Sequence, residues 1–382
     1  MQHGHSIPMT KDYSNLKIIY HHPRTITESG KSGSEVRPYK MLKAFKELGA
    51  TVIEVTGDLR TRTSRMREVK IRIQQGERFD FAYSENLTIP FAMSESHRLP
   101  LNPLVDHRFL AFCKENGVPV SLFNRDVYWR DVSYKEMLPW WGRLVTIPLH
   151  WFDLWYHTKY LNTLYLPSAA MARVLPWIHK FTNLRYLPPG AEIDHTDNKT
   201  QHSKDLKIFY VGGIEPPTYD LRPLLAAIKD SKAKVSLTIC CREKEWNKVS
   251  ALYKPLLNEQ IKIVHLSGKD LLPLYRESDL FAVARDPGSY VDFSVPIKIY
   301  ESIGFALPIL CTPGGETARI VESEGFGWVK SADEIANFID ELVLQPEILE
   351  SKRTMLKSLQ VNHTWKARAA RVCDDMCNGT RK

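Results

Sequence analysis

Short apolar segments rich in β-branched residues alternate with segments of helical periodicity along this chain, and this alternation limits the possible folds more than any other feature. The first set consists of the apolar segment 16–21 (LKIIYH), a glycine-containing loop, a helical pattern over 36–48 and the apolar segment 51–55 (TVIEV). This order is that of a βαβ unit, in which both strands lie parallel in one sheet. We therefore predict a parallel sheet covered by helices.

The alternation occurs twice, and the two runs are separated by the almost wholly polar stretch 191–207. Before that stretch, strands are predicted at 79–84, 118–123, 162–166 and 184–187, with a helix at 106–116. After it, strands are predicted at 207–211, 235–240, 261–264, 280–284 and 308–311, with helices at 221–230, 296–303 and 333–344. A length of 382 residues suits two domains. The predicted fold class is α/β, with two Rossmann-like doubly wound domains.

Charge and composition limit the possible partners. The 52 Lys+Arg residues exceed the 44 Asp+Glu residues, and the net charge of +8 favours an acidic partner such as phosphate, an anionic membrane or nucleic acid. The polar start of the chain argues against a secretory signal, and no apolar run is long enough to span a bilayer. The six cysteines lack paired spacing, which is typical of buried thiols in a cytoplasmic protein.

Six segments resemble, in order, the two-domain glycosyltransferases of GT-B architecture, and more narrowly their retaining family four, the group 1 enzymes. These segments are SGSEVRPYKMLKAFKELGATVIEV, VPVSLFNRDVYW, LPPGAEID, KIFYVGGIEPP, VPIKIYESIGFALPILCTPGGETARIVE and HTWKARAARV. The resemblance covers roughly residues 16–378 and implies two Rossmann-like domains that face each other across a cleft. It implies an acceptor domain at 1–195, a nucleotide-sugar-binding domain at 205–362, and a helix at 363–382 that crosses back to the first domain.

The resemblance assigns a donor-binding role to the helix that contains Lys298 and Glu301. The cation suits the diphosphate of a nucleotide sugar, and the carboxylate suits the ribose hydroxyls. Because the two residues are three positions apart, a surface ion pair between them is the alternative interpretation. The family's second glutamate is replaced by Phe293, and the neighbouring Asp292 is a possible substitute.

The cations that the family uses to neutralise the leaving diphosphate are missing here, since the matching positions lie near Gly213 and Thr218. Two arginines that directly follow predicted strands could replace them, because ligands bind at the carboxyl ends of parallel strands. Arg242 is our first choice and Arg285 our second. A solvent-facing loop arginine is the alternative interpretation of Arg242.

Two glycine loops are further candidates for phosphate binding, because each precedes a predicted helix and offers backbone N–H groups. The first contains Gly33 and Ser34, and the second contains Gly315. Gly213 ends the first strand of the second domain and is included in the predicted donor site. The string that begins at Gly30 is not a P-loop, because that motif requires glycine at position 25, which is threonine.

Arg125 and Asp126 end a predicted strand of the first domain and are the predicted catalytic pair. In the resembled family this position carries a His-Asp pair whose histidine contacts the transferred sugar. Arg125 replaces that histidine, whereas Asp126 could contact the acceptor hydroxyl or the sugar. The alternative is a structural ion pair between Asp126 and Arg125 or Arg130. We interpret His107 as a helix-surface residue rather than a catalytic base.

Two features favour an anionic membrane surface. Trp140, Trp141, Trp151 and Trp155 share a stretch of helical periodicity, which fits either an interfacial or a buried helix. The second feature is a dense basic run that includes Arg60, Arg62, Arg65 and Arg67, for which a solvated basic helix is the alternative. Together they predict a cytoplasmic enzyme associated with the inner face of the membrane and a lipid-linked acceptor.

The leading functional prediction is a retaining glycosyltransferase that moves a sugar from a nucleotide-sugar donor to a glycan acceptor in surface polysaccharide or glycolipid biosynthesis. No D-x-D sequence occurs, which predicts a metal-independent enzyme with no cofactor besides its substrates. A nucleotide-sugar epimerase and a catalytically degenerate nucleotide-sugar-binding subunit are the alternatives. A nucleic-acid partner is rejected, because the basic run has no interleaved aromatic residues.

Overall fold

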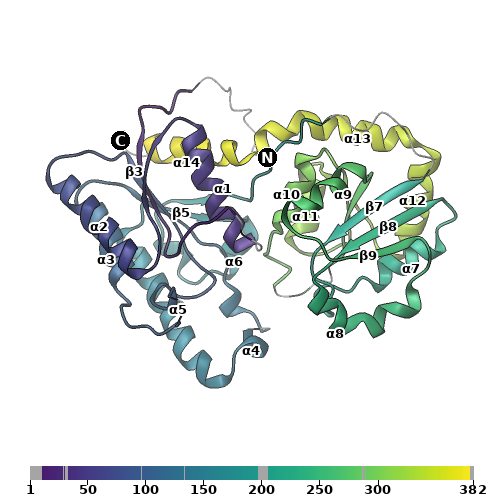
Figure 1. The fold of residues 1–382 in the computed structure, drawn as a ribbon, viewed down its shortest axis with the longest axis horizontal. Helices are drawn as coiled ribbons and strands as arrows, with labels where there is room; N and C mark the ends of the chain where they lie inside the picture. Colours follow the sequence, from purple (N-terminus) through teal and green to yellow (C-terminus); the bar gives the residue numbers. More distant parts are fainter. Residues whose placement is uncertain are drawn as a thin grey trace. The chain divides into compact units, whose positions relative to one another are not determined.

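The computed structural model describes residues 11–28, 30, 33–95, 97–132, 134–196, 205–285, 288 and 290–378, with the side chains at 33, 34, 136, 137 and 378 excepted. It divides the chain into two compact units (Figure 1). Unit 1 comprises Met1–Pro189 and Trp365–Lys382, and unit 2 comprises Gly190–Thr364. The first segment of unit 1 therefore ends at Pro189, six residues before position 195, where the sequence predicted the end of the first domain.

Unit 1 contains a six-stranded parallel sheet in the order β2-β1-β3-β4-β5-β6. Its strands are β1 (Lys17–His21), β2 (Thr51–Val55), β3 (Phe81–Glu85), β4 (Val120–Phe123), β5 (Thr163–Leu166) and β6 (Leu184–Tyr186). The central strands are buried on both sides, as the uninterrupted apolar runs of the sequence predicted.

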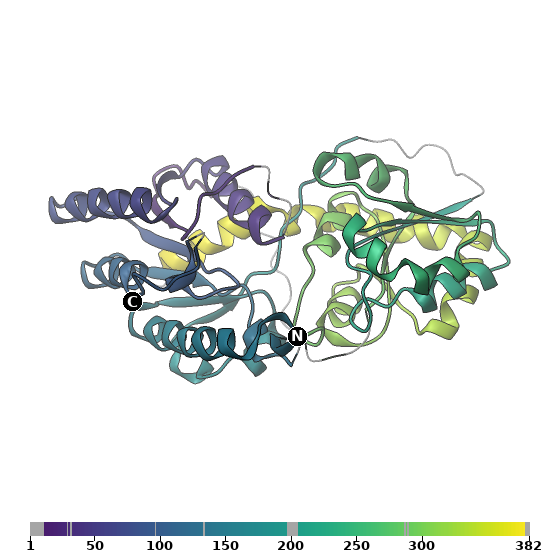
Figure 2. The same ribbon diagram turned by 60° about the horizontal axis from the view of Figure 1, so that its bottom comes forward.

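Helices cover both faces of this sheet (Figures 1 and 2). One face is covered by α1 (Gly33–Glu47) and α14 (Trp365–Asn378), and the other by α2 (Leu59–Gln74), α3 (Val105–Glu115) and α5 (Trp140–Tyr160). The shorter helices α4 (Tyr134–Met137) and α6 (Ala169–Val174) lie in connections. The Asp58 side chain accepts a hydrogen bond of 2.8 Å from the Thr61 N–H and so begins α2.

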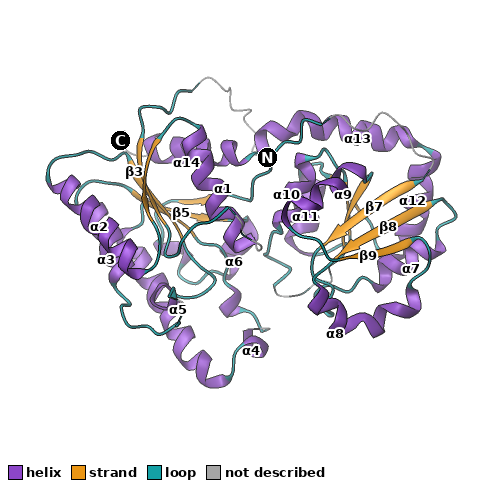
Figure 3. Ribbon diagram, in the orientation of Figure 1, coloured by secondary structure: helices purple, strands orange, loops and turns teal. Residues whose placement is uncertain are grey.

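Unit 2 contains a second six-stranded parallel sheet in the order β12-β11-β10-β7-β8-β9 (Figure 3). Its strands are β7 (Leu206–Val211), β8 (Val235–Cys240), β9 (Ile261–Val264), β10 (Leu280–Val283), β11 (Ile309–Cys311) and β12 (Gly327–Val329). Because β10 lies between β7 and β11, the loop that follows β10 begins near the middle of the sheet edge.

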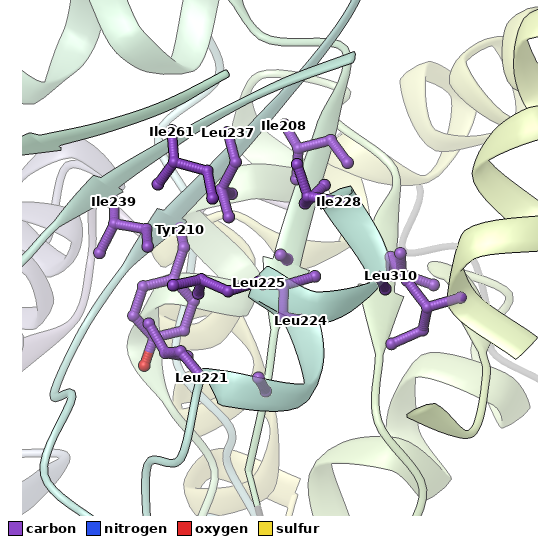
Figure 4. Close-up of a cluster of buried hydrophobic side chains, with 14 of the residues drawn as sticks. Ile208, Tyr210, Leu221, Leu224, Leu225, Ile228, Leu237, Ile239, Ile261 and Leu310 are labelled. Atoms are coloured by element: carbon purple, nitrogen blue, oxygen red, sulfur yellow. The ribbon is translucent and has the colours of Figure 1, made fainter. Parts of the chain in front are cut away.

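Two hydrophobic clusters fix the helices of unit 2 on its sheet. The first contains α7 (Arg222–Asp230), α8 (Glu243–Tyr253) and α12 (Ala332–Leu344), and Figure 4 shows Leu224, Leu225 and Ile228 of α7 pointing toward side chains of the sheet. The second contains α9 (Leu272–Glu277), α10 (Ile297–Gly304) and α11 (Gly315–Ser323), and α13 (Pro346–Leu359) contributes to both. Each sheet therefore has helices on both faces, and the predicted doubly wound fold class is confirmed.

Candidate functional site

Arg285 follows β10 and is the most deeply buried of the predicted donor-site cations, with 6% of its surface exposed. Its guanidinium donates to the Ser294 hydroxyl at 2.9 Å and to the Thr317 hydroxyl at 3.3 Å. Ser294 precedes α10, and Thr317 lies in the first turn of α11. These contacts hold the guanidinium at the carboxyl edge of the sheet, where doubly wound folds bind ligands.

The charge of Arg285 is not neutralised within the part of the chain that the structure describes. No described carboxylate forms an ion pair with this guanidinium, and its buried Nε–H has no hydrogen-bond partner there. A guanidinium has five N–H donors. Among the described residues, the Arg285 guanidinium donates two hydrogen bonds, both to hydroxyl oxygens. A buried cation without a counter-ion is costly, so this arrangement suits an anionic ligand.

Two of the predicted glycines allow the chain to pack closely at this edge. A Cβ atom on Gly213 would lie 2.8 Å from the ring of Tyr219, and that ring lies 5.5 Å from the Arg285 guanidinium. A Cβ atom on Gly315 would lie 2.7 Å from the Val291 carbonyl oxygen, and the positive φ of +72° also favours glycine. Both glycines therefore shape the surroundings of Arg285 and of the start of α11.

Lys298 and Glu301 form the ion pair that was the alternative to a donor-binding role, with 2.6 Å between Lys298 Nζ and Glu301 Oε2. The buried Tyr275 hydroxyl donates to the same oxygen at 3.0 Å. Since both contacts use Oε2, the second carboxylate oxygen, Oε1, is left for a ligand hydroxyl. The ion pair and the donor-binding role are therefore compatible.

Two further predicted donor-site residues, Arg242 and Asp292, are exposed. The side chain of Arg242 is 78% exposed and pairs with Glu245 at 3.8 Å at the start of α8, which is the solvent-facing alternative. Our preference for Arg242 over Arg285 is therefore not supported by the geometry. Asp292 is exposed, whereas Phe293 is buried against Tyr290. The substitution of Asp292 for the missing glutamate stays a prediction.

In unit 1, Arg125 is bound to a buried carboxylate rather than to Asp126. Its guanidinium lies 3.5 Å from Glu85 Oε2, and the other oxygen of Glu85 lies 3.5 Å from Arg37 Nε. Asp126 accepts the Tyr128 N–H at 3.1 Å and forms no ion pair with any described residue, so the predicted alternative of a pair with Arg125 or Arg130 is wrong. Burial raises the pKa of Asp126, although the charge of Arg125 opposes that effect.

The ion pairs of Glu85 and Arg37 were not predicted from the sequence. Glu85 is fully buried at the end of β3 and also accepts the Tyr83 hydroxyl at 2.8 Å, while the guanidinium carbon of Arg37 on α1 lies 3.4 Å from the centre of the Phe123 ring. The sequence signal that could have indicated a buried ion pair was an acidic residue, Glu85, at the end of an apolar strand.

Arg62 was predicted to lie on a membrane-facing surface, and this prediction is wrong. Its side chain is 1% exposed and pairs with Asp106, with Nε at 2.7 Å from Oδ1 and Nη2 at 3.2 Å from Oδ2. Asp106 also lies 2.8 Å from His21 Nε2. Arg62 is on the inward face of α2 together with Met66 and Val69, whereas Arg60, Arg65 and Arg67 are exposed.

Comparison with known proteins identifies the second unit. Residues 205–345 match the family model described as glycosyl transferases group 1. Over these residues, unit 2 is similar to the group 1 glycosyl transferases. This match confirms the predicted resemblance and the predicted enzyme class, and it covers Arg285, Lys298, Glu301 and Gly315. The search of curated proteins found no match for the chain.

Solved structures that resemble the chain share its fold along almost its whole length. A glycosyltransferase from Rickettsia africae has a TM-score of 0.62 at 13% identity, covering 97% of this chain and 100% of that one. Anabaena Alr3699/HepE in complex with UDP and glucose has a TM-score of 0.56 at 11% identity, covering 95% and 100%. WaaG, a glycosyltransferase involved in lipopolysaccharide biosynthesis, has a TM-score of 0.54 at 11% identity, covering 94% and 99%. At these identities the likeness establishes the GT-B fold.

In unit 1, the tryptophans of α5 differ in exposure. Trp140 and Trp141 are 67% and 63% exposed at the start of the helix, next to Leu144 and Val145 at 66% and 44%. Trp155 is 43% exposed, whereas Trp151 packs against Trp129 and Trp177. The start of α5 is therefore an exposed apolar surface. Among the described helices, none is both long enough and apolar enough to cross a membrane.

His107 was interpreted as a helix-surface residue, and this interpretation is wrong. It is fully buried on α3, with Nε2 at 2.9 Å from Asp153 and Nδ1 at 3.1 Å from the Tyr160 hydroxyl. The helical pattern of α3 alone does not distinguish this position from a surface one, because the polar partners come from α5.

Proposed function

We propose that this protein is a retaining, metal-independent glycosyltransferase that uses a nucleotide sugar as donor. The single observation that carries the proposal is the buried, unneutralised guanidinium of Arg285 in a domain similar to the group 1 glycosyl transferases. A nucleotide sugar carries negative charge on its diphosphate. HepE, which shares the fold, was solved with UDP and with UDP-glucose. A nucleotide sugar is therefore the anionic ligand that we assign to unit 2.

Arg285 has the properties that the leaving group requires. In the transfer, the bond between the anomeric carbon and the diphosphate oxygen breaks, and the electron pair leaves with the nucleoside diphosphate. The acceptor oxygen then bonds to the anomeric carbon, and its proton passes to the departing diphosphate oxygen. Negative charge grows on the diphosphate in the transition state, and a fixed cation stabilises that charge without reorganising. Arg285 would supply this charge in place of the family's missing pair and without a metal ion.

Glu301 is the proposed contact for the ribose hydroxyls. Lys298 and Tyr275 orient its carboxylate through Oε2, so that Oε1 can accept a hydrogen bond from the ligand. In this role Lys298 is first a positioning residue for Glu301. Its positive charge, on the same helix, would also attract the diphosphate. The retaining outcome is proposed on the resemblance to family four alone.

We further propose that the acceptor is a lipid-linked glycan, used at the inner face of the membrane in the synthesis of a surface polysaccharide or glycolipid. The exposed apolar surface formed by Trp140, Trp141, Leu144 and Val145 supports contact with a bilayer interface. The exposed Arg60, Arg65 and Arg67 would add attraction to anionic lipids, whereas the buried Arg62 would not.

The test is a thermal-shift panel of nucleotide sugars with the full chain, because a ligand at about 100 times its Kd stabilises the native state by about 2.7 kcal/mol. We expect at least one nucleotide sugar to raise the melting temperature in the presence of EDTA. Arg285→Gln should weaken that ligand by about 10- to 100-fold, as for a lost charge-assisted hydrogen bond. Arg242→Gln is the matched control and should bind normally.

Three results would contradict parts of the proposal. No stabilisation by any nucleotide sugar would exclude the donor assignment, and stabilisation that disappears with EDTA would exclude a metal-independent site. Equal losses in the Arg285 and Arg242 variants would remove Arg285 from the diphosphate site. An assay with the donor found in this way then measures how much donor is consumed and how much acceptor is glycosylated. Only a transferase consumes donor in proportion to glycosylated acceptor, so the assay separates a transferase from an epimerase or a degenerate subunit.

A further inference from the structure

A small cavity in unit 1 is lined by polar groups that the proposed function does not use. It lies beyond the carboxyl ends of β3 and β4 and has a volume of about 20 Å³. The loops after these strands, the short helix Tyr128–Arg130 and α5 contribute the polar and aromatic lining residues Asn86, Asn124, Asp126, Trp129, His150 and His157. Each of these residues belongs to unit 1.

Two buried histidines line this cavity, and each has a ring nitrogen with no hydrogen-bond partner among the described residues. His150 is 9% exposed and His157 is 3% exposed, and in both the unpartnered atom is Nε2. They are seven positions apart on α5, and Asp153 and Leu154 between them also line the cavity. One face of α5 therefore contributes residues to the cavity lining at helical spacing.

The other buried ionisable side chain of α5 at the cavity, Asp153, has hydrogen-bond partners. Asp153 accepts the Phe91 N–H at 2.9 Å and contacts His107 Nε2 at 2.9 Å. Trp129 stacks on the imidazole of His150 with ring centres 5.3 Å apart and planes 5° apart, which fixes the orientation of that ring. Buried polar groups in folded proteins normally have partners, so unpartnered ones in a cavity indicate a bound polar molecule or group.

The chemistry of the lining indicates which group this is. Burial lowers the pKa of His150 to about 3 and that of His157 well below its ordinary value, so both rings are neutral at physiological pH. A neutral imidazole nitrogen can donate or accept a hydrogen bond, and Asp126 Oδ2 can accept one. An anion is disfavoured by the carboxylate of Asp126, because Arg125 is directed to Glu85. The lining therefore suits an uncharged hydroxyl group.

The size of the cavity leads to the same conclusion. A single water requires roughly 10–15 Å³ of such space, so about 20 Å³ admits a hydroxyl or hydroxymethyl group but not a sugar ring. We propose that this cavity is a recognition subsite for one hydroxyl-bearing arm of an uncharged sugar in the acceptor, with His150 and His157 as its hydrogen-bonding residues. This inference rests on the proposed function, since it names a feature of the acceptor substrate.

The test measures binding of methyl glycosides of glucose, galactose, mannose and N-acetylglucosamine to the full chain by saturation-transfer NMR. We expect at least one glycoside to bind, and His150→Leu and His157→Leu each to weaken it by about tenfold, as for a lost hydrogen bond in a buried site. The exposed His179 is the matched control, and His179→Leu should bind the glycoside as the native chain does. Deoxy analogues of the bound glycoside then identify the recognised hydroxyl.

A thermal measurement distinguishes recognition from a structural role. Leucine removes the unpartnered nitrogens at similar volume, so His150→Leu and His157→Leu should keep or raise the melting temperature of the unliganded chain. His107→Leu should lower it, because Asp153 would lose one of its two hydrogen-bond partners and the Tyr160 hydroxyl would lose its contact with His107. If both cavity variants lowered the melting temperature as much as His107→Leu does, the histidines would be structural.

Three results would overturn the proposal. These are no binding of any glycoside, binding that survives in both cavity variants, and equal affinity for every deoxy analogue, each of which would leave an ordered water as the occupant. The nucleotide-sugar panel is run on the same variants and should be unchanged, because the donor residues belong to unit 2. Failure of that panel with intact glycoside binding would reject the proposed donor site and keep the subsite.

Discussion

Replacing Arg62 by methionine should destabilise unit 1 strongly, although the residue belongs to a run of arginines that resembles a surface helix. The guanidinium makes a two-point ion pair with Asp106 and donates to the carbonyl oxygens of Pro23 and Gly57 at 2.9 and 2.8 Å. Methionine keeps most of the apolar stem but removes every one of these hydrogen bonds. Asp106 would then retain the contact with His21 as its remaining side-chain partner.

The magnitude follows from the burial of the pair. Removing one partner of a buried ion pair typically costs about 3–5 kcal/mol, because the other charge stays in a medium of low polarity. Burial raises the pKa of Asp106, but the hydrogen bond and charge of His21 and those of Arg62 outweigh this effect and hold it at about 2. For a unit of this size, a loss of about 4 kcal/mol lowers the melting temperature by roughly 10 °C.

Urea and thermal unfolding followed by tryptophan fluorescence would measure this effect. Seven of the nine tryptophans lie in unit 1, so the fluorescence reports mainly on that unit. Arg67→Met is the matched control on α2, since Arg67 is exposed and the charge change is the same. We expect the control to change stability by about 0.5 kcal/mol or less. Similar losses in both variants would refute the assignment of Arg62 to a buried ion pair.

Three further predictions concern stability in acid, the substitution of Gly213 and the exposed tryptophans of α5. Burial lowers the pKa of both His22 and His150 to about 3, so only the unfolded chain takes up these protons between pH 6.5 and 3, and each histidine should cost about 1.4 kcal/mol of stability per pH unit as the pH falls through that range. A flat profile of urea midpoints from pH 7 to 5 would contradict this. Gly213→Ala should displace the ring beneath Arg285 and weaken nucleotide-sugar binding by about tenfold, with at most about 1 kcal/mol lost in stability; calorimetry with unchanged affinity would count against it. Trp140→Ser combined with Trp141→Ser should reduce sedimentation with anionic vesicles while leaving the unfolding midpoint within error, and undiminished sedimentation would remove the membrane proposal.

The sequence by itself determined the doubly wound fold and most of its strands. The predicted segments 51–55, 235–240 and 261–264 coincide with strands of the structure, because short segments rich in β-branched residues are a local signal of strands. It also placed Glu301 and Lys298 on one helix and Arg285 after a strand. The strand β12 was missed because its three residues, GWV, begin with glycine, which is depleted in strands.

Which of these residues are buried, and beside what, was decided only by the tertiary structure. Arg62 meets Asp106, 44 positions away, and His107 meets Asp153, 46 positions away, so no local pattern distinguishes these two residues from surface ones. The order of strands favours Arg285 over Arg242, because β10 is central in the sheet and the loop after β8 is exposed. Hydrophobic periodicity is a local property of the chain, whereas the pairing of buried charges depends on contacts between distant segments.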